Sequence, residues 1–255
     1  MHNYLKEKLR RKQITLGVTV GLGCSEVSES LANLGLDWIG IDLQHTSIYT
    51  EKLEVMLQAM SYSECTPIVR VVSNDLGLIN RALDMGAHGT IIPIVNGRED
   101  AKKAAQASRY APKGIRSWAP RRPALRDPDY AATADAEVMV IPQIETELSV
   151  KNVEEIVSTD GIDAVFIGPY DLSLSLGVFR QFNDPKYLRA VEKVVSACEA
   201  HSVAPGLLAP TGTMEAIVRQ GFKLISLGGD LGILTQALTA SVKNAREVIA
   251  RQNGA

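Results

Sequence analysis

The chain has 255 residues and a nearly balanced charge, because 27 lysines and arginines stand against 29 aspartates and glutamates, and the basic residues form no stripe of the kind that binds nucleic acid. No run approaches the about 20 apolar residues that a membrane span needs, and the opening MHNYLKEKLRRK has no apolar centre of a signal peptide. We therefore expect a soluble, cytoplasmic protein with neither a nucleic-acid nor a membrane partner.

Short apolar, β-branched runs recur along the whole chain and predict eight strands. Continuous apolar runs of this kind are typical of strands that are buried on both faces of a parallel sheet. The predicted strands are ITLGVTV from Ile14, DWIGIDL from Asp37, TPIVRVV from Thr66, GTIIPIV from Gly89, EVMVIPQI from Glu137, DAVFIGP from Asp163, APGLLA from Ala204 and FKLISLGG from Phe222.

Amphipathic helical patterns fill the gaps between these runs, and helical crossovers require neighbouring strands to be parallel. Eight β/α units match the size of an α/β TIM (β/α)8 barrel, which has about 250 residues, so we predict one such domain over residues 1–255. A doubly wound sheet would have fewer strands and a glycine-rich first turn, and GLGCSE lacks the third glycine of that fingerprint. The predicted helices are SEVSESLANLG, EKLEVMLQAM, DLGLINRALDMG, EDAKKAAQASRY, ELSVKNVEEIV, the stretch around DPKYLRAVEKVVSACEAH, TMEAIVRQG and a last helix from Leu231 toward Ile249.

One irregular stretch, from about residue 111 to residue 135, separates the fourth predicted helix from the fifth strand. It is too long for a simple turn and too short for a domain. Three interpretations stand for it: an active-site lid, an anion-binding loop or a subunit contact. It contains Pro112, Pro120, Pro123 and Pro128, together with Arg116, Arg121, Arg122 and Arg126.

Two carboxylates stand just beyond neighbouring apolar runs, Glu145 in VMVIPQIETE and Asp171 in AVFIGPYDLS. If the two runs are adjacent strands, they lie about 5 Å apart, and both side chains project from one edge of the sheet. That arrangement suits one hard divalent cation. Taken singly, each acid is explained as well by capping the helix that follows it.

Other reactive side chains fall where strands end, which in a barrel is where active sites form. The second strand ends at Asp42 and His45, and Asp42 could orient the imidazole for proton transfer near neutral pH. Arg70 lies in the apolar run PIVRVV, where a guanidinium needs an anionic partner. That partner is either Asp42 or a carboxylate or enolate substrate. His45 has the structural alternative of a hydrogen-bonded residue beside a helix start.

The sequence gives little support for catalysis by a cysteine or by a Schiff-base lysine. Cys24, Cys65 and Cys198 form no CxxC pair and are best explained as small buried residues. A Schiff-base mechanism needs a lysine inside the barrel, whereas Lys223 lies at the wrong end of its strand and Lys113 lies in the long loop. A metal-dependent mechanism is therefore favoured over a Schiff-base mechanism.

The motifs IDLQHTS, TPIVRV, VIPQIETE and IGPYDLSLSLG together resemble the HpcH/HpaI family of class II pyruvate aldolases, and RYAPKGIR, DPDY and APGLLA extend the resemblance over nearly the whole chain. The resemblance implies a TIM barrel whose C-terminal helix is exchanged with a neighbouring subunit. It also implies a homo-oligomer, either a trimer or a hexamer built from trimers.

Carried over motif by motif, the resemblance implies that Glu145 and Asp171 bind one magnesium, manganese or cobalt ion per subunit. Gln143 and the backbone at Tyr170 would touch the substrate, His45 would be the general base, and Arg70 would stabilise the enolate oxygen. Asp84, in RALDMG, matches the acid that raises the basicity of the histidine, across a subunit boundary. Asp42 is a further catalytic candidate because of its place beside His45.

The implied reaction is the reversible cleavage of a 4-hydroxy-2-oxo acid to pyruvate and an aldehyde through a pyruvate enolate. Two positions depart from the family pattern: Gln44 replaces a glutamate, and Tyr170 replaces a small residue and would narrow the pocket if its ring points inward. The alternative reaction is oxaloacetate decarboxylation or a related carbon–carbon cleavage. A CoA lyase would need a basic nucleotide pocket, and no clear one is visible.

Two hypotheses from other classes remain. Gln44 motivates a ligand-binding barrel that has lost turnover. Gly228 and Gly229, after the last strand, stand at a common phosphate position of TIM barrels, although they are equally explained by a tight turn.

Overall fold

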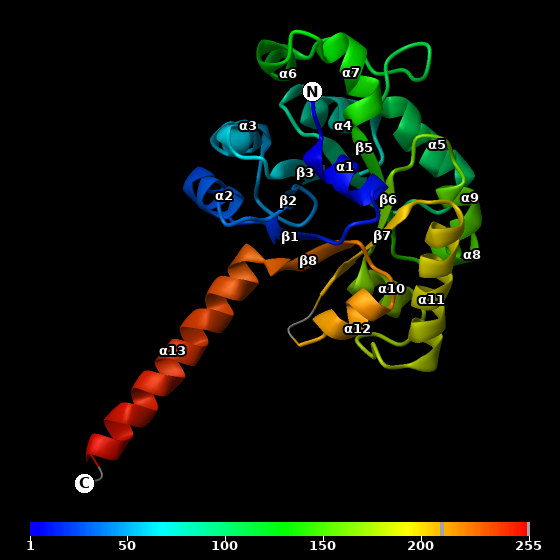
Figure 1. The fold of residues 1–255 in the computed structure, drawn as a ribbon. Helices are drawn as coiled ribbons and strands as arrows, with labels where there is room; N and C mark the ends of the chain where they lie inside the picture. Colours follow the sequence, from blue (N-terminus) through cyan, green and yellow to red (C-terminus); the bar gives the residue numbers. More distant parts are fainter. Residues whose placement is uncertain (210–211, 254–255) are drawn as a thin grey trace.

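In the computed structural model, which describes residues 1–209 and 212–253, parallel strands close into a barrel in sequence order, and β8 pairs back with β1 (Figure 1). The predicted TIM barrel is confirmed. The strands are β1 (Thr15–Val20), β2 (Trp38–Asp42), β3 (Thr66–Arg70), β4 (Gly89–Ile92), β5 (Met139–Ile144), β6 (Ala164–Ile167), β7 (Ala204–Leu208) and β8 (Leu224–Gly229).

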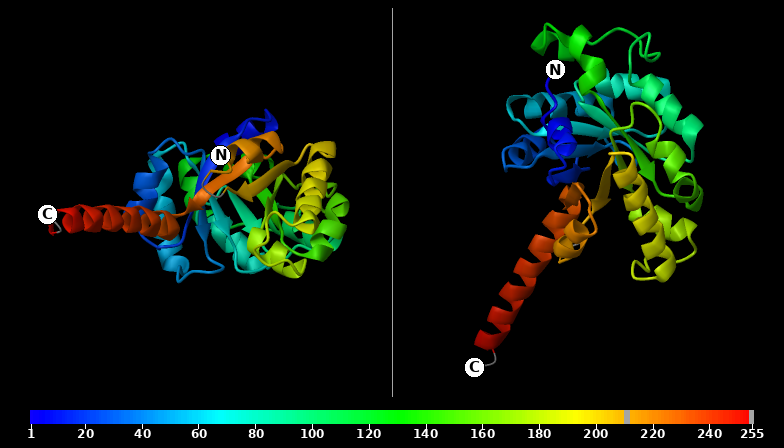
Figure 2. Two further views of the ribbon diagram at one scale, coloured as in Figure 1. Left: turned by 90° about the horizontal axis from the view of Figure 1, so that it is seen from below. Right: turned by 45° about the vertical axis from the view of Figure 1, so that its right-hand side comes forward.

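Helices follow the strands and surround most of the barrel, as Figure 2 shows from two further directions. Within the described ranges, no helix combines the length and the apolar character that crossing a membrane requires. The helices before the last one are α1 (Tyr4–Arg10), α2 (Ser25–Ala32), α3 (Thr50–Ala59), the 3₁₀ turn η1 (Met60–Tyr62), α4 (Leu76–Asp84), α5 (Arg98–Ala107), α6 (Arg121–Arg126), α7 (Tyr130–Glu137), α8 (Glu147–Lys151), α9 (Val153–Val157), α10 (Pro169–Ser175), α11 (Pro185–Ala200) and α12 (Met214–Arg219).

The interior of the barrel is filled by side chains from alternate strand positions. Trp38, Ile68 and Met139 pack there, whereas their chain neighbours Ile39 and Val69 face the surrounding helices. Because both faces of each strand are covered, the strands read as continuous apolar runs.

Helix α1 closes the N-terminal end of the barrel. Leu5 and Leu9, four residues apart and therefore on one face of the helix, are buried in the interior cluster. The side chain of Asn3 caps the helix by accepting from the amide of Lys6 at 3.0 Å. The sequence pattern of this opening predicts no helix, so α1 is a finding of the structure.

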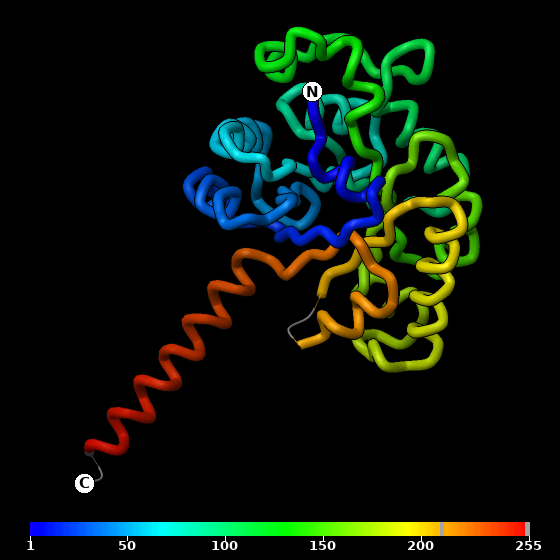
Figure 3. Tube along the Cα trace, viewed as in Figure 1, coloured from blue at the N-terminus to red at the C-terminus, as the bar shows by residue number. Residues whose placement is uncertain are grey.

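The stretch from about residue 111 to residue 135 is less irregular than predicted, because it contains α6 and α7. Pro123 is the third residue of α6, where its missing N–H has no partner within the helix in any case. The segment joins the end of α5 to the start of β5, which places it at the N-terminal end of the barrel. In Figure 3 the N-terminus lies close to it, and the amine of Met1 donates to Thr133 Oγ1 at 2.6 Å.

Helix α13 (Asp230–Asn253) follows β8 but does not fold back onto the barrel; it projects away from it in every view (Figures 1 and 2). An apolar stripe with helical spacing runs along its exposed surface. Its members are Leu231, Leu234, Leu238, Val242 and Ile249, each between 44% and 61% exposed. Within the described chain, nothing covers this stripe.

Candidate active site

The two predicted carboxylates do leave adjacent strands. Strands β5 and β6 are parallel neighbours, with Ile144 paired to Ile167, so Glu145 and Gly168 come next on the same edge of the barrel. Helix α10 begins at Pro169 and carries Asp171 in its first turn. The backbone thus brings both acids to the C-terminal end of the barrel, where the active sites of this fold lie.

The carboxylate of Glu145 is buried and held from two sides. One oxygen accepts from the amide of Ile94 at 2.7 Å, and the other accepts from the side-chain amide of Gln143. Burial raises the pKa of Glu145, and the negative charge of Asp171 raises it further, whereas the two hydrogen bonds act in the opposite direction. A carboxylate whose charge is costly in this way gains from a nearby cation.

Gly168 lets α10 approach Glu145 closely. A Cβ at this position would lie 2.8 Å from Gln143 Nε2 and 2.9 Å from Glu145 Oε2, both too short for a real contact. Any larger residue at position 168 would therefore require the side chains of Gln143 and Glu145 to move.

Arg70 is paired with Asp42 on the neighbouring strand, which was one of the two partners expected for it. Its Nε donates to Asp42 Oδ1 at 2.8 Å and its Nη2 donates to Asp42 Oδ2 at 2.7 Å. Asp42 also accepts from the amide of Gln44. Among the described residues the carboxylate of Asp42 pairs with the guanidinium of Arg70 and makes no hydrogen bond to the imidazole of His45, so its suggested role in orienting His45 stays a prediction.

A cavity of about 260 Å³ opens at this end of the barrel. Arg70, Gln143, Tyr170 and Asp171 line it together with backbone and apolar groups. Gln143 Oε1 is buried without a partner in the described chain, so the cavity contains an unsatisfied acceptor. No lysine among the described residues lines it, which supports the preference against a Schiff base.

The donor set fits a divalent cation. Glu145 and Asp171 supply the hard carboxylate oxygens that such ions prefer. Across residues 1–209 and 212–253, no cluster of three or more His, Cys, Asp or Glu residues suited to a metal occurs. The protein would therefore provide a two-carboxylate site and leave other positions for water and substrate.

His45 and Asp84 do not line this cavity. His45 follows β2 on the same rim, with an exposed side chain that makes no hydrogen bond within the described chain. Asp84 ends α4 at the opposite end of the barrel and accepts from Arg116 Nη2 at 2.7 Å. Burial raises the pKa of Asp84, and Arg116 opposes that shift.

The structure argues against the hypothesis that Gly228 and Gly229 bind a phosphate. Asp230, the next residue, accepts from the amides of Gly21 at 3.0 Å and Leu22 at 3.0 Å. These amides are thus already bound to the carboxylate of Asp230. The glycine at 228 has φ +139°, which explains it as a turn residue.

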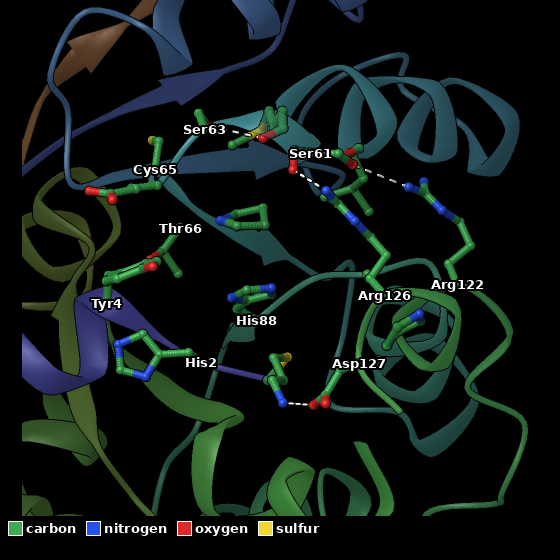
Figure 4. A pocket seen from close by; sticks show the side chains of 17 residues that line it. His2, Tyr4, Ser61, Ser63, Cys65, Thr66, His88, Arg122, Arg126 and Asp127 are labelled. Carbon is green, nitrogen blue, oxygen red and sulfur yellow. Dashed lines mark hydrogen bonds and ion pairs between the residues drawn. The ribbon is translucent and has the colours of Figure 1, made fainter. Parts of the chain in front are cut away.

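The lid interpretation of the stretch 111–135 is not supported, since none of its residues lines the active-site cavity. The stretch instead borders a separate cavity of about 380 Å³ at the N-terminal end, where Arg122 and Arg126 face the segment that carries Ser61 and Cys65 (Figure 4). His88 lies in the same cavity, and burial lowers its pKa to about 4.

The family model of the HpcH/HpaI aldolase/citrate lyase family matches residues 21–237. The chain belongs to this family. It is 33% identical over 251 residues to a 5-keto-4-deoxy-D-glucarate aldolase of Enterobacter sp. (strain 638), covering 94% of this chain and 97% of the relative. It is 34% identical over 242 residues to a pyruvate aldolase of Rhizobium etli, covering 93% and 95%.

Among solved structures, the chain is similar to an HpcH/HpaI aldolase/citrate lyase family protein from Burkholderia cenocepacia J2315. The TM-score is 0.91 at 32% sequence identity, and the match covers 96% of this chain and 99% of the other. The resemblance that the motifs indicated is confirmed at the level of family and fold, and the curated relatives bear the names of carbon–carbon lyases.

Two contributions to the site were missed in the sequence. Ile94 donates its amide to Glu145 from a left-handed backbone conformation, φ +53°, which is rare for a β-branched residue. Such strain is concentrated at functional sites. The sequence predicts a strand that includes Gly168, whereas β6 ends at Ile167, and only the motif IGPYD distinguishes this glycine.

Proposed function

We propose that this protein is a divalent-metal-dependent aldolase that reversibly cleaves a 4-hydroxy-2-oxo acid to pyruvate and an aldehyde. The observation that carries the proposal is the meeting of a buried carboxylate, Glu145, with Asp171, Gln143 and Arg70 at one end of the barrel. The names of the curated relatives support the same reaction class.

Glu145 and Asp171 would hold one magnesium, manganese or cobalt ion. When bound, such an ion supplies Lewis acidity toward a 2-oxo acid. Gln143 would position the substrate through its unpaired acceptor and its amide, and the backbone at Tyr170 would border it.

Arg70 stabilises the negative charge that develops when pyruvate becomes an enolate. Its Nε and Nη2 are fixed by Asp42, so the group is oriented before the substrate arrives. Preorganised charge of this kind is usually the largest catalytic contribution. In the cleavage direction, His45 accepts the proton of the 4-hydroxyl group, and the bond between carbons 3 and 4 breaks to leave the enolate and an aldehyde.

The active form would be a homo-oligomer, a trimer or a hexamer, in which α13 packs on a neighbouring subunit. The uncovered stripe of α13 supports this, because a helix with an apolar face is stable only when that face is buried. Asp84 would then act on the histidine of a neighbouring subunit, since within its own chain it stands at the opposite end of the barrel.

The proposal is tested by following deuterium uptake into the methyl group of pyruvate and cleavage of a 4-hydroxy-2-oxo acid. Both reactions should stop when the ion is removed with a chelator and return when manganese or magnesium is restored. Glu145→Ala and Asp171→Ala should abolish both. Full activity of the chelator-treated protein, or of either variant, would refute the proposal.

The alternative is oxaloacetate decarboxylation, which produces the same enolate without an aldehyde. Pyruvate formation from oxaloacetate that exceeds 4-hydroxy-2-oxo acid cleavage, without exchange of an aldehyde, would favour it. A barrel that only binds ligands would bind pyruvate without catalysing deuterium uptake.

A further inference from the structure

A basic groove lies at the end of the barrel opposite the active site. It has a volume of about 650 Å³ and is bordered by α1, α5, the end of α7 and the loop 158–163. Asp163 at its floor directly precedes β6, whereas the active-site residues lie at or just beyond the C-terminal ends of the strands. The groove is therefore separate from the site described above.

The floor of the groove contains two buried cations and one carboxylate. Lys6 Nζ lies 2.8 Å from Asp163 Oδ1, and Arg109 Nη2 lies 3.5 Å from Asp163 Oδ2. Lys6 is 4% exposed and Arg109 is 7% exposed. Arg109 Nη1 is buried and has no hydrogen-bond partner within the described chain. One positive charge at the floor is thus left without compensation, which is costly in a buried position.

The rim of the groove contains more cations than acids. Arg10, Arg98, Lys102 and Lys113 line it, and none of them forms an ion pair with the residues that the structure describes. Six basic side chains therefore face three acidic ones, Asp135, Asp160 and Asp163, in a protein whose formal net charge is −2. The local charge has the opposite sign to that of the whole chain.

We propose that this groove binds a small oxyanion with two or more negative charges, of the phosphate or phosphate-ester type. Such a ligand would compensate the excess charge on the floor and would be reached by the long side chains of the rim. Lysine and arginine form charge-assisted hydrogen bonds to phosphate oxygens, roughly twice as strong as neutral ones. The proposal does not depend on the reaction catalysed at the other end of the barrel.

The test is a calorimetric titration of the full-length, metal-loaded protein with inorganic phosphate in a phosphate-free buffer. Chloride at equal ionic strength controls for general screening. We expect saturable binding that Lys102→Ala/Lys113→Ala weakens at least tenfold. The matched control is Arg189→Ala/Lys193→Ala, which removes the same charge from exposed positions of α11 and should leave the dissociation constant unchanged.

A second variant moves the affinity in the other direction. Asp160→Asn removes an exposed rim carboxylate and should tighten phosphate binding severalfold, a result that damage to the fold would not produce. Phosphate should also leave pyruvate deuterium uptake unchanged, since the groove is remote from the active-site cavity. The proposal is overturned if binding is not saturable, if both double variants bind equally, or if phosphate competes with pyruvate.

Discussion

Asp42 holds the guanidinium of Arg70 through two parallel hydrogen bonds of 2.8 and 2.7 Å, across the adjacent strands β2 and β3. Asp42 is buried, whereas Arg70 lines the active-site cavity. A bidentate pair fixes both the position and the plane of an arginine. The arginine is therefore oriented by the barrel itself.

Asp42→Asn should slow pyruvate deuterium uptake by about 100-fold, since misplacing a catalytic group by about 1 Å has this effect. Asparagine keeps the size of the side chain but accepts only one of the two hydrogen bonds. Asp37→Asn, which removes an ion-paired acid at the other end of β2, is the control and should retain the exchange rate. Equal rates in both variants would show that the orientation of Arg70 does not matter.

Gly168→Ala should weaken metal binding without unfolding the protein. The added Cβ would come within 3 Å of Gln143 and Glu145, so the two side chains must move apart. Gly97→Ala is the matched control, because its Cβ would meet only Asn152 at 3.5 Å, an ordinary contact. Manganese affinity measured by titration should fall at least tenfold for Gly168→Ala alone. Unchanged affinity would mean that this close approach has no part in holding the carboxylates.

The fold could be predicted because its pattern is local. Each strand is an apolar run that is covered on both faces, and each crossover has helical periodicity. The order of the strands in the barrel and their parallel direction therefore follow from the order of these runs along the chain. The adjacency of Glu145 and Asp171 followed in the same way, since consecutive strands of this barrel are neighbours. Helices α1, α6, α7 and α10 are absent from the predicted helices, because each is short, with six to eight residues.

The hydrogen-bond partners of the site residues were harder to predict from the sequence than the fold. The sequence offered Asp42 and a substrate anion as partners of Arg70, and the pairing with Asp42 follows only from the strand register that sets Asp42 opposite Arg70. The amide of Ile94 reaches Glu145 from a loop whose conformation no propensity indicates. Asp84 and Arg116 meet across 32 positions of sequence, through a segment that had been read as irregular.

Glu145→Gln should stabilise the metal-free protein at pH 7.5 by about 1 kcal/mol, or about 2–4 °C in Tm. The raised pKa of Glu145 means that its charge opposes folding once the pH exceeds that pKa, and the cost disappears as the pH falls below the ordinary value of 4.5. A glutamine avoids the cost, and rotation of the Gln143 amide would let its unpaired oxygen accept from the new group.

The measurement is thermal unfolding of both proteins after chelation, at pH 7.5 and at pH 4.5. The advantage of the variant should shrink at the lower pH, and added manganese should stabilise only the wild type. A glutamine variant that is less stable than the wild type at pH 7.5 would contradict the inference that the buried charge of Glu145 destabilises the metal-free protein.

Tyr170→Ala should broaden the range of accepted aldehydes. Tyr170 lines the active-site cavity, and its ring packs against Phe182 at 5.7 Å and under the guanidinium of Arg180 at 5.6 Å. Removal of the ring enlarges the cavity beside Asp171 without touching the carboxylates. We expect the ratio of kcat/KM for a bulky over a two-carbon aldehyde to rise about 10-fold or more, within the range expected for a changed apolar pocket.

Pyruvate deuterium uptake should stay nearly constant in Tyr170→Ala, because that step involves no aldehyde. Tyr62→Ala, at a side chain that is 98% exposed and remote from the cavity, is the control and should change neither quantity. A parallel loss of exchange and aldehyde turnover would place Tyr170 in the pyruvate site instead.

His88 should make the protein lose stability as the solution becomes mildly acidic. Burial, followed by the positive charges of the N-terminal amine and Arg126, lowers its pKa to about 4 from an ordinary 6.5 (Figure 4). Between these values the unfolded chain takes up a proton that the folded chain does not, so unfolding becomes easier as the pH falls. From pH 7.5 to pH 5 the loss of unfolding free energy attributable to this group is about 2 kcal/mol.

His88→Gln should remove that part of the pH dependence in urea unfolding, whereas His201→Gln, at an exposed residue, should retain it. Identical pH slopes for the wild type and His88→Gln would mean that folding does not lower the pKa of the imidazole.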